Sequence, residues 1–189
     1  MPQTQKTGLT RRSKALIGAV LCIVLAAATV ALLHKRSIDA AAREPRALHL
    51  PDGTEAYFRG DTVVRPAQTY PVPKEIHVDG DAFIRLPVTP GPWTVRTRLL
   101  VLTVDGGSTF RITAYSKQTG EQVEVVHGRM EARKSYPSPY AVPDLLGPGE
   151  MVMINRTIDL MEKERTNADE VRRWGEALRA EADAQSVQR

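Results

Sequence analysis

Residues 99–114, LLVLTVDGGSTFRITA, carry the pattern that determines the expected fold. In the last part, 110–114, apolar residues alternate with polar ones, and a period of two is typical of a β-strand with one buried face. The first part opens instead with four consecutive apolar residues, 99–102, which favours a central strand covered on both faces. The Asp-Gly-Gly sequence between them favours a tight turn. The stretch therefore predicts two successive strands.

The same two signals recur on both sides of this stretch. Apolar and polar residues also alternate at 75–78 and at 93–96. Five turn-forming sequences separate the alternating segments: PDG at 51–53, DGD at 79–81, DGG at 105–107, QTG at 118–120 and GPG at 147–149. We expect DGD to be a hairpin turn whose two aspartates flank the glycine. Residues 47–157 are therefore predicted to form a mainly β, sandwich-like domain.

The pattern changes in residues 158–189, which we assign to a C-terminal helix and tail. A capping-type Thr-Asn-Ala-Asp sequence is followed by three apolar residues at helical spacing: Val171, Trp174 and Leu178. These predict a helix over 168–184, with Gly175 weakening its middle by up to ~1 kcal/mol relative to Ala. We expect Trp174 to anchor this helix on the β domain. A solvated tail helix with an incidental Trp is the alternative.

An uncharged stretch at 15–33 predicts a membrane anchor. Its 19 residues would span roughly 28 Å as a helix, close to the ~30 Å core of a bilayer. Four basic residues precede it: Lys6, Arg11, Arg12 and Lys14. The positive-inside rule then predicts a cytoplasmic tail at 1–14, a transmembrane helix at 15–33, a stalk at 34–46 and an exported domain. In a bacterium this arrangement predicts a single-pass inner-membrane protein whose main domain is periplasmic.

Two other export signals compete with the anchor. The small residues at 40–42 could end a cleaved signal peptide, and the pair Arg11-Arg12 could indicate twin-arginine export. We favour the uncleaved anchor because signal-peptide cores are shorter, roughly 7–15 residues. Paired basic residues before a membrane helix also follow from the topology rule alone.

The distribution of charge excludes nucleic-acid binding. The chain has a net charge of +4, but residues 1–36 hold six Lys or Arg and no acid. The remainder holds 20 Lys or Arg against 22 Asp or Glu, a net charge of 20 − 22 = −2. The basic character belongs to the membrane flank, whereas binding to phosphates needs a basic face on the domain itself. The single cysteine, Cys22, lies in the apolar stretch, so no disulfide forms within the chain.

The sequence offers no chemistry typical of an enzyme. His49, His77 and His127 are far apart, and none has a Cys or His neighbour at metal-ligand spacing. Ser108 follows a turn and lacks a nucleophile-elbow pattern, and no phosphate-binding loop or dinucleotide fingerprint is present. We therefore predict no catalytic, cofactor or metal residues and assign no binding residues.

Six short motifs occur in an order that resembles the FecR family of bacterial transmembrane regulators. They are LPDGTEAY at 50–57, VDGDAFIRL at 78–86, PWTVRT at 92–97, GSTFRI at 107–112, VEVVHGRM at 123–130 and LGPGE at 146–150. Each is weak alone, but their common order and spacing make the resemblance specific. It covers roughly residues 48–154 and implies the FecR-type β domain.

The family resemblance implies a function in envelope signalling. Family members combine a cytoplasmic anti-sigma segment, one membrane helix, and an exported β domain followed by a module that contacts a TonB-dependent receptor. We expect this chain to lack the anti-sigma segment and the receptor-contacting module, and so not to sequester a sigma factor itself. Expected partners are the membrane and an envelope protein, such as a TonB-dependent receptor or a sigma-factor regulator. The alternative is an envelope scaffold or ligand-binding module.

Overall fold

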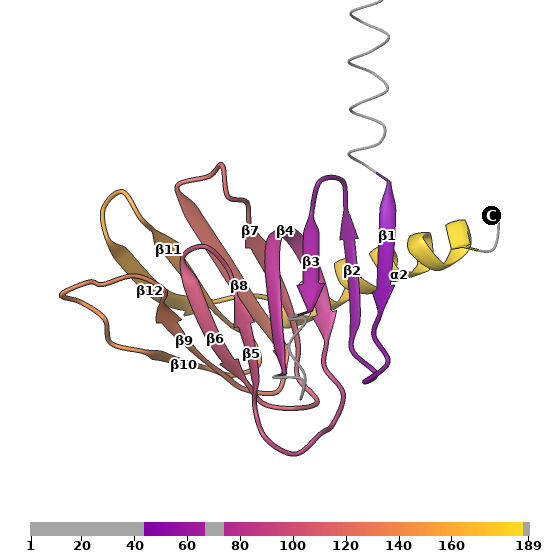
Figure 1. Ribbon diagram of the computed structural model, residues 1–189, viewed down its shortest axis with the longest axis horizontal. Coiled ribbons are helices and arrows are strands. Elements are labelled where there is room, and N and C mark those ends of the chain that lie inside the picture. Colours follow the sequence, from indigo (N-terminus) through magenta and orange to yellow (C-terminus); the bar gives the residue numbers. More distant parts are fainter. Residues whose placement is uncertain (1–43, 67–73, 187–189) are drawn as a thin grey trace, which may run out of the picture. The chain divides into compact units, whose positions relative to one another are not determined.

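A computed structural model describes residues 44–66 and 74–186 (Figure 1). The predicted cytoplasmic tail, transmembrane helix and most of the stalk lie outside these residues. Among the described residues, no helix has both the length and the apolar character needed to cross a bilayer. The described part contains twelve strands and one helix: β1 (Pro45–His49), β2 (Glu55–Arg59), β3 (Val63–Pro66), β4 (Glu75–Arg85), β5 (Trp93–Arg96), β6 (Leu100–Val104), β7 (Thr109–Ala114), β8 (Gly120–His127), β9 (Met130–Lys134), β10 (Asp144–Leu146), β11 (Glu150–Asn155), β12 (Leu160–Arg165) and α2 (Ala168–Ser186).

The strands form one curled sheet rather than the two separate layers of the expected sandwich. Nine of them follow the order β10-β9-β6-β5-β4-β7-β8-β11-β12, with β1, β2 and β3 attached through β4. All pairs are antiparallel except β4–β5. At one end β10 returns beside β11, and Lys163 on β12 donates from Nζ to the carbonyl of Leu145 on β10 at 2.9 Å. The fold is therefore mainly β and nearly closed, like a barrel.

Strand β4 makes the curl possible because it belongs to both halves of the sheet. Its first half pairs with β3 and β5, and its second half pairs with β2 and β7. Gly80 lies between the halves with a φ of 128°, and an added Cβ would come within 2.4 Å of the Thr62 hydroxyl. The hairpin turn predicted at 79–81 is thus wrong. Glycine is needed here because the strand bends with a positive φ at this position, and Thr62 in the turn before β3 leaves no room for a Cβ.

The predicted alternation correctly identifies the core. Residues Ile76, Val78, Trp93, Val95, Phe110, Ile112 and Ala114 are all buried. Residues 99–102 are also buried, and β6 lies between β5 and β9, so the prediction of a central strand is confirmed. The apolar side chains of the two halves face one another and form one continuous core.

Helix α2 covers part of the outer face of the sheet. Its buried residues Val171, Leu178 and Ala182 pack on a second apolar cluster, separate from the main core, that includes Tyr57, Phe83 and Val126. Trp174 packs on this cluster while partly exposed. The predicted helix and its docking are confirmed, and the helix ends two residues beyond the predicted residue 184.

The sheet also continues past residue 157. Strand β12 occupies Leu160–Arg165, within the region that the sequence pattern assigns to the helix and tail. Its sequence LMEKER shows no alternation of apolar and polar residues. Both faces of this edge strand are largely exposed, so no position along it has to be apolar.

Candidate protein-contact surface

The histidines singled out in the sequence lie at separate places. His49 on β1 contacts the Tyr57 ring edge-on, with ring centres 5.9 Å apart. His77 on β4 is exposed and lies 2.9 Å from a carboxylate oxygen of Glu75, and His127 is exposed at the end of β8. Within residues 44–66 and 74–186, no three His, Cys, Asp or Glu side chains are grouped to hold a metal.

Ser108 is buried in the turn before β7. Its amide donates to the carbonyl of Asp105 at 3.3 Å, and its carbonyl accepts from the amide of Leu86 at 2.9 Å. The hydroxyl lies 3.5 Å from the carbonyl of Arg129. These are the contacts of a residue that holds a turn against two neighbouring strands.

Asp81 acts in a network that connects the sheet to α2. Arg111 donates to its carboxylate through two nitrogens, at 2.9 and 2.8 Å. The same guanidinium lies 3.9 Å from the centre of the Trp174 ring and 3.8 Å from a carboxylate oxygen of Glu124. Thr166, just before the helix, donates to Glu124 at 2.7 Å. Paired donation to a carboxylate and stacking on an indole both suit arginine, so Arg111 joins β4, β8 and the helix.

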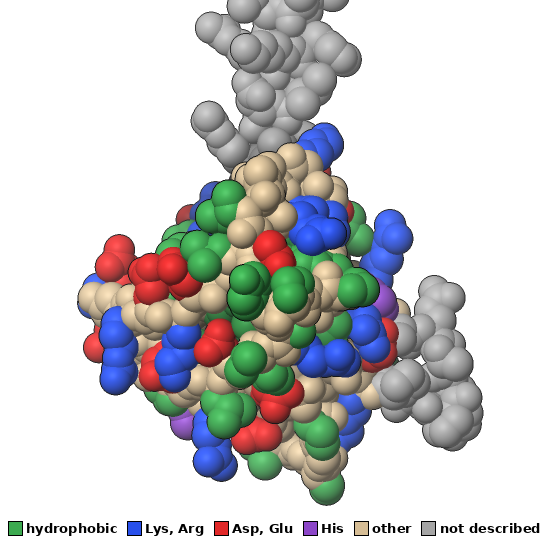
Figure 2. All heavy atoms as spheres, turned by 90° about the vertical axis from the view of Figure 1, so that its left-hand side faces the viewer, with side chains coloured by type: hydrophobic (Ala, Val, Ile, Leu, Met, Phe, Trp, Pro, Cys, Tyr) green, Lys and Arg blue, Asp and Glu red, His purple; other side chains and the backbone are tan. Residues whose placement is uncertain are grey.

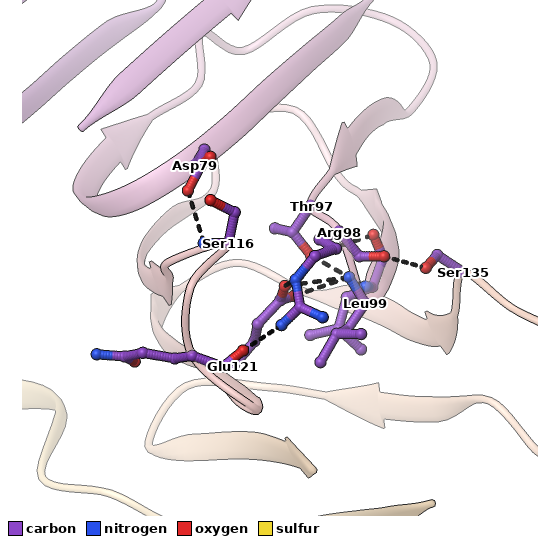
Figure 3. A network of polar contacts seen from close by, with 9 residues as sticks. Asp79, Thr97, Arg98, Leu99, Ser116, Glu121 and Ser135 are labelled. Carbon is purple, nitrogen blue, oxygen red and sulfur yellow. Dashed lines mark hydrogen bonds and ion pairs between the residues drawn. The ribbon is translucent and has the colours of Figure 1, made fainter. Parts of the chain in front are cut away.

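A buried carboxylate, Glu121, holds the β5–β6 turn against β8 (Figure 3). It accepts from the amide of Leu99 at 3.1 Å through each oxygen and from the hydroxyl of Thr97, and Arg98 lies 3.8 Å away. The pKa of Glu121 is raised because burial disfavours its charged form, and this effect outweighs the opposing contacts with Thr97, Leu99 and Arg98. The carboxylate is saturated by neighbours of its own chain, which marks a structural group.

A second polar cluster fastens the β11–β12 turn to the segment after β9. Asp159 accepts from Lys134 at 2.9 Å, from Tyr136 at 2.9 Å and from Ser138 at 2.7 Å. Hydrogen bonds from Lys134 and Ser138 lower the pKa of Asp159 to about 2. The Lys134 side chain is almost wholly buried, so this ion pair satisfies a charge that water cannot reach.

The cluster around Asp159 brings two apolar segments to the same end of the domain. Apart from Val88, the large exposed apolar side chains of the described residues belong to these segments: Tyr140, Val142 and Leu145 after β9, and Ile158 and Leu160 at the β11–β12 turn. Figure 2 views the domain from this side and shows hydrophobic side chains interspersed with separate acidic and basic groups. Apolar groups left exposed beside charged ones are typical of a protein-contact surface.

Strand β12 lies beside these exposed apolar side chains. It is the last strand of the sheet path, and five of its six residues are exposed. We define the exposed apolar residues of the two segments together with β12 as the contact surface. Its elements are a group of exposed apolar side chains and an open strand edge, both of which can bind protein.

The comparison with solved structures identifies a related domain. Two crystal structures, at 1.65 and 2.50 Å resolution, of a "putative anti-sigma factor" from Parabacteroides distasonis match this chain with a TM-score of 0.60 and 28% sequence identity. The described β domain is anti-sigma-like. The match covers 69% of this chain and 60% of that chain, so it spans less than two thirds of the relative's length. No protein-family model matches the sequence, and no curated protein matches it.

The sequence did not reveal the residues that build this surface. Lys134 and Asp159, whose ion pair fastens the two segments, are 25 positions apart in the sequence. One signal could have indicated the open strand edge. Residues 160–165 do not alternate between apolar and polar, and a strand that has no buried face is typically an edge strand.

Proposed function

We propose that this chain is a FecR-like single-pass membrane protein whose exported β domain acts in cell-envelope signalling through protein contacts. The observation that carries the proposal is the similarity to the anti-sigma factor structure, at 28% identity over 69% of the chain. An anti-sigma factor works by binding a protein rather than by catalysis. The ordered FecR-type motifs, which span the same β domain, support the same assignment.

The contact surface supports this proposal over an enzymatic function. The polar clusters at Glu121 and Asp159 are satisfied by neighbouring residues, while apolar side chains such as Tyr140 and Val142 are 74% and 77% exposed. Exposed apolar surface beside an open strand edge costs solubility unless a partner covers it. The partner we propose is an envelope protein, either a TonB-dependent receptor or a sigma-factor regulator.

Affinity capture tests the proposal directly. The detergent-solubilised full-length chain is used as bait, and the captured proteins are identified by mass spectrometry. We expect enrichment of a receptor or of a component of a sigma-factor pathway. Deletion of residues 2–9, with the basic flank retained, should leave this capture unchanged, since the proposal places the contacts in the β domain. Capture that depends on residues 2–9 would contradict it.

The outcome of the capture also separates the two candidate functions. Enrichment of structural envelope proteins, with no receptor and no sigma-factor component, would indicate the scaffold alternative. Loss of capture on substitution of Tyr140 and Leu145 by Ser, in a chain that remains folded by circular dichroism, would place the contact on the apolar patch.

A further inference from the structure

The open edge of β12 has a defined hydrogen-bonding pattern. The amide of Arg156, just after β11, donates to the carbonyl of Thr119 at 2.9 Å. Because backbone groups alternate in direction along a strand, the amides of Val152 and Ile154 also point towards β8, and those of Met151, Met153 and Asn155 point towards β12. In the observed register, the residues that bond to β11 are therefore Leu160, Glu162 and Glu164. The amide of Thr166, which donates to Gly149 at 3.0 Å, continues this alternation.

The backbone groups of the other three β12 residues consequently point away from the sheet. These are Met161, Lys163 and Arg165. In the part of the chain that the structure describes, no strand pairs with this side of β12. An incoming strand can therefore use three amides and three carbonyls without displacing any bond to β11.

The two faces of β12 carry opposite charge. Glu162 and Glu164 lie opposite Met153 and Met151 on the outer face, whereas Lys163 and Arg165 lie opposite Val152 and Glu150 on the inner face. Lys163 is partly neutralised, at 3.2 Å from Glu150. Both glutamates and Arg165 are exposed. The edge thus presents acidic groups on one face, basic groups on the other, and Leu160 at its start.

This pattern disfavours pairing with a second copy of the chain. Two antiparallel copies that continue one sheet are related by a twofold axis normal to it, so outer residues face outer residues and inner residues face inner residues. Glu162 and Glu164 would then lie opposite glutamates, and Lys163 and Arg165 opposite basic residues or Met161. Like charges directly opposite one another destabilise a strand pair.

We propose that β12 is a docking edge for an extended segment of another protein with the inverse charge pattern. That segment pairs antiparallel with β12, places basic side chains against Glu162 and Glu164, acidic ones against Lys163 and Arg165, and apolar ones against Leu160 and Met161. The inference rests on the proposed function in protein contact and adds the position and the sequence chemistry of the partner.

Two synthetic peptides of identical composition test the charge pattern. The first contains Glu-Lys-Glu-Lys-Val-Leu, the order that complements β12 in antiparallel pairing, and the second contains Lys-Glu-Lys-Glu-Val-Leu. Binding of each labelled peptide to the full-length chain in detergent is measured by fluorescence anisotropy. We expect the complementary peptide to bind about tenfold more tightly, since four opposing charge pairs change sign between the two. Equal affinity of the two peptides, or binding of neither, overturns the proposal.

Amide exchange distinguishes strand addition from simple charge attraction. On binding, the amides of Met161, Lys163 and Arg165 should become protected from hydrogen exchange, while those of Leu160, Glu162 and Glu164 should already be protected in the free chain. Tighter binding of the complementary peptide without this alternating protection would contradict β-pairing at the edge.

Matched variants complete the test. Charge reversal by Glu162→Lys with Glu164→Lys should abolish the preference between the peptides, because each peptide then faces two opposite and two like charges. Arg165→Pro should weaken binding of both because it removes an outward amide. Thermal unfolding of each variant by circular dichroism checks that the fold is intact. If these variants still capture the same envelope partner as the parent chain, the edge proposal fails while the proposed function stands.

Discussion

At the scale of single residues, Asp159 combines an unusual backbone conformation with a buried ion pair. Its φ of 52° is the only positive value among the described non-glycine residues. The carboxylate accepts hydrogen bonds from the buried Lys134 at the end of β9 and from two side chains that follow it, Tyr136 and Ser138. Asp and Asn tolerate this left-handed region better than most residues. The strained turn is therefore held in place by the same contacts that order the contact surface.

The pH dependence of stability should report the Asp159 carboxylate. Its pKa is lowered from 3.8 to about 2 in the folded chain, so its ionised form stabilises the native state above the ordinary pKa. This stabilisation is lost as the pH falls through the folded pKa. We expect Asp159→Asn, which keeps the left-handed turn, to lower the unfolding temperature at pH 6 and to differ much less from the parent near pH 2.

Thermal unfolding by circular dichroism between pH 2 and pH 7 measures this difference. Asp61→Asn, at an exposed aspartate, is the control and should unfold like the parent throughout. A constant gap between parent and Asp159→Asn over the whole range would show that the carboxylate's charge is not responsible.

Gly175 is required by packing rather than by flexibility. An added Cβ would lie 2.5 Å from three ring carbons of Phe83, far inside van der Waals contact. We expect Gly175→Ala to destabilise the chain by about 1–3 kcal/mol, because overpacking outweighs the gain of up to ~1 kcal/mol in helix propensity. Urea unfolding measures the change. Ala177→Gly, the reverse substitution at an exposed helix position, isolates the effect of helix propensity and should cost about 1 kcal/mol.

At the scale of elements, α2 is stabilised by tertiary contact. Its buried stripe lies on the sheet, and Arg59 and Arg85 reach Glu181 and Glu176 at 2.6 and 3.8 Å. These ion pairs are exposed and contribute little. Leu178 is 1% exposed, whereas Trp174 is only half-buried and stacks on Arg111. Apolar burial around Leu178 therefore dominates the docking.

Two alanine substitutions should rank these contacts. We expect Leu178→Ala to cost about 2–5 kcal/mol, as for a buried leucine, and Trp174→Ala to cost less than about 3 kcal/mol because the indole is only partly buried. Equilibrium unfolding in urea measures both, with Arg173→Ala at an exposed helix position as the control. A larger loss for Trp174→Ala than for Leu178→Ala would assign the anchoring role to the tryptophan.

At the scale of the whole molecule, the sheet closes through long-range pairings. Strand β4 joins the two halves at the Gly80 bend, and Lys163 and Asp159 tie β12 and its turn to segments before β11. Residues 44–66 and 74–186 supply one continuous core. The contact surface lies where the two ends of the strand path approach one another.

The membrane anchor remains a prediction of the sequence, since residues 15–33 lie outside the described part. We expect protein extracted from membranes to retain the N-terminal residues Met1 or Pro2, because the apolar stretch is long enough to span a bilayer. N-terminal sequencing or intact mass spectrometry of the membrane fraction measures this. Recovery of a soluble form that begins at Arg43 would establish cleavage instead.

The sequence by itself determined the features that depend on local periodicity. Alternation identified the buried faces around Phe110 and Trp93, the apolar run at 99–102 identified a central strand, and capping and helical spacing identified α2. These signals are readable because each side chain's burial follows from its position in a regular element.

Only the tertiary structure decided the curled, nearly closed sheet and the contact surface. The bend at Gly80 depends on Thr62, the buried charge of Lys134 depends on Asp159, and the close packing of Gly175 depends on Phe83. Each of these pairs lies 18 or more positions apart in the sequence, so no local pattern contains it. The open edge of β12 is likewise a property of the completed sheet. Strand β12 has an open edge because it pairs with β11 on one side and with no described strand on the other, and its own six residues do not determine this.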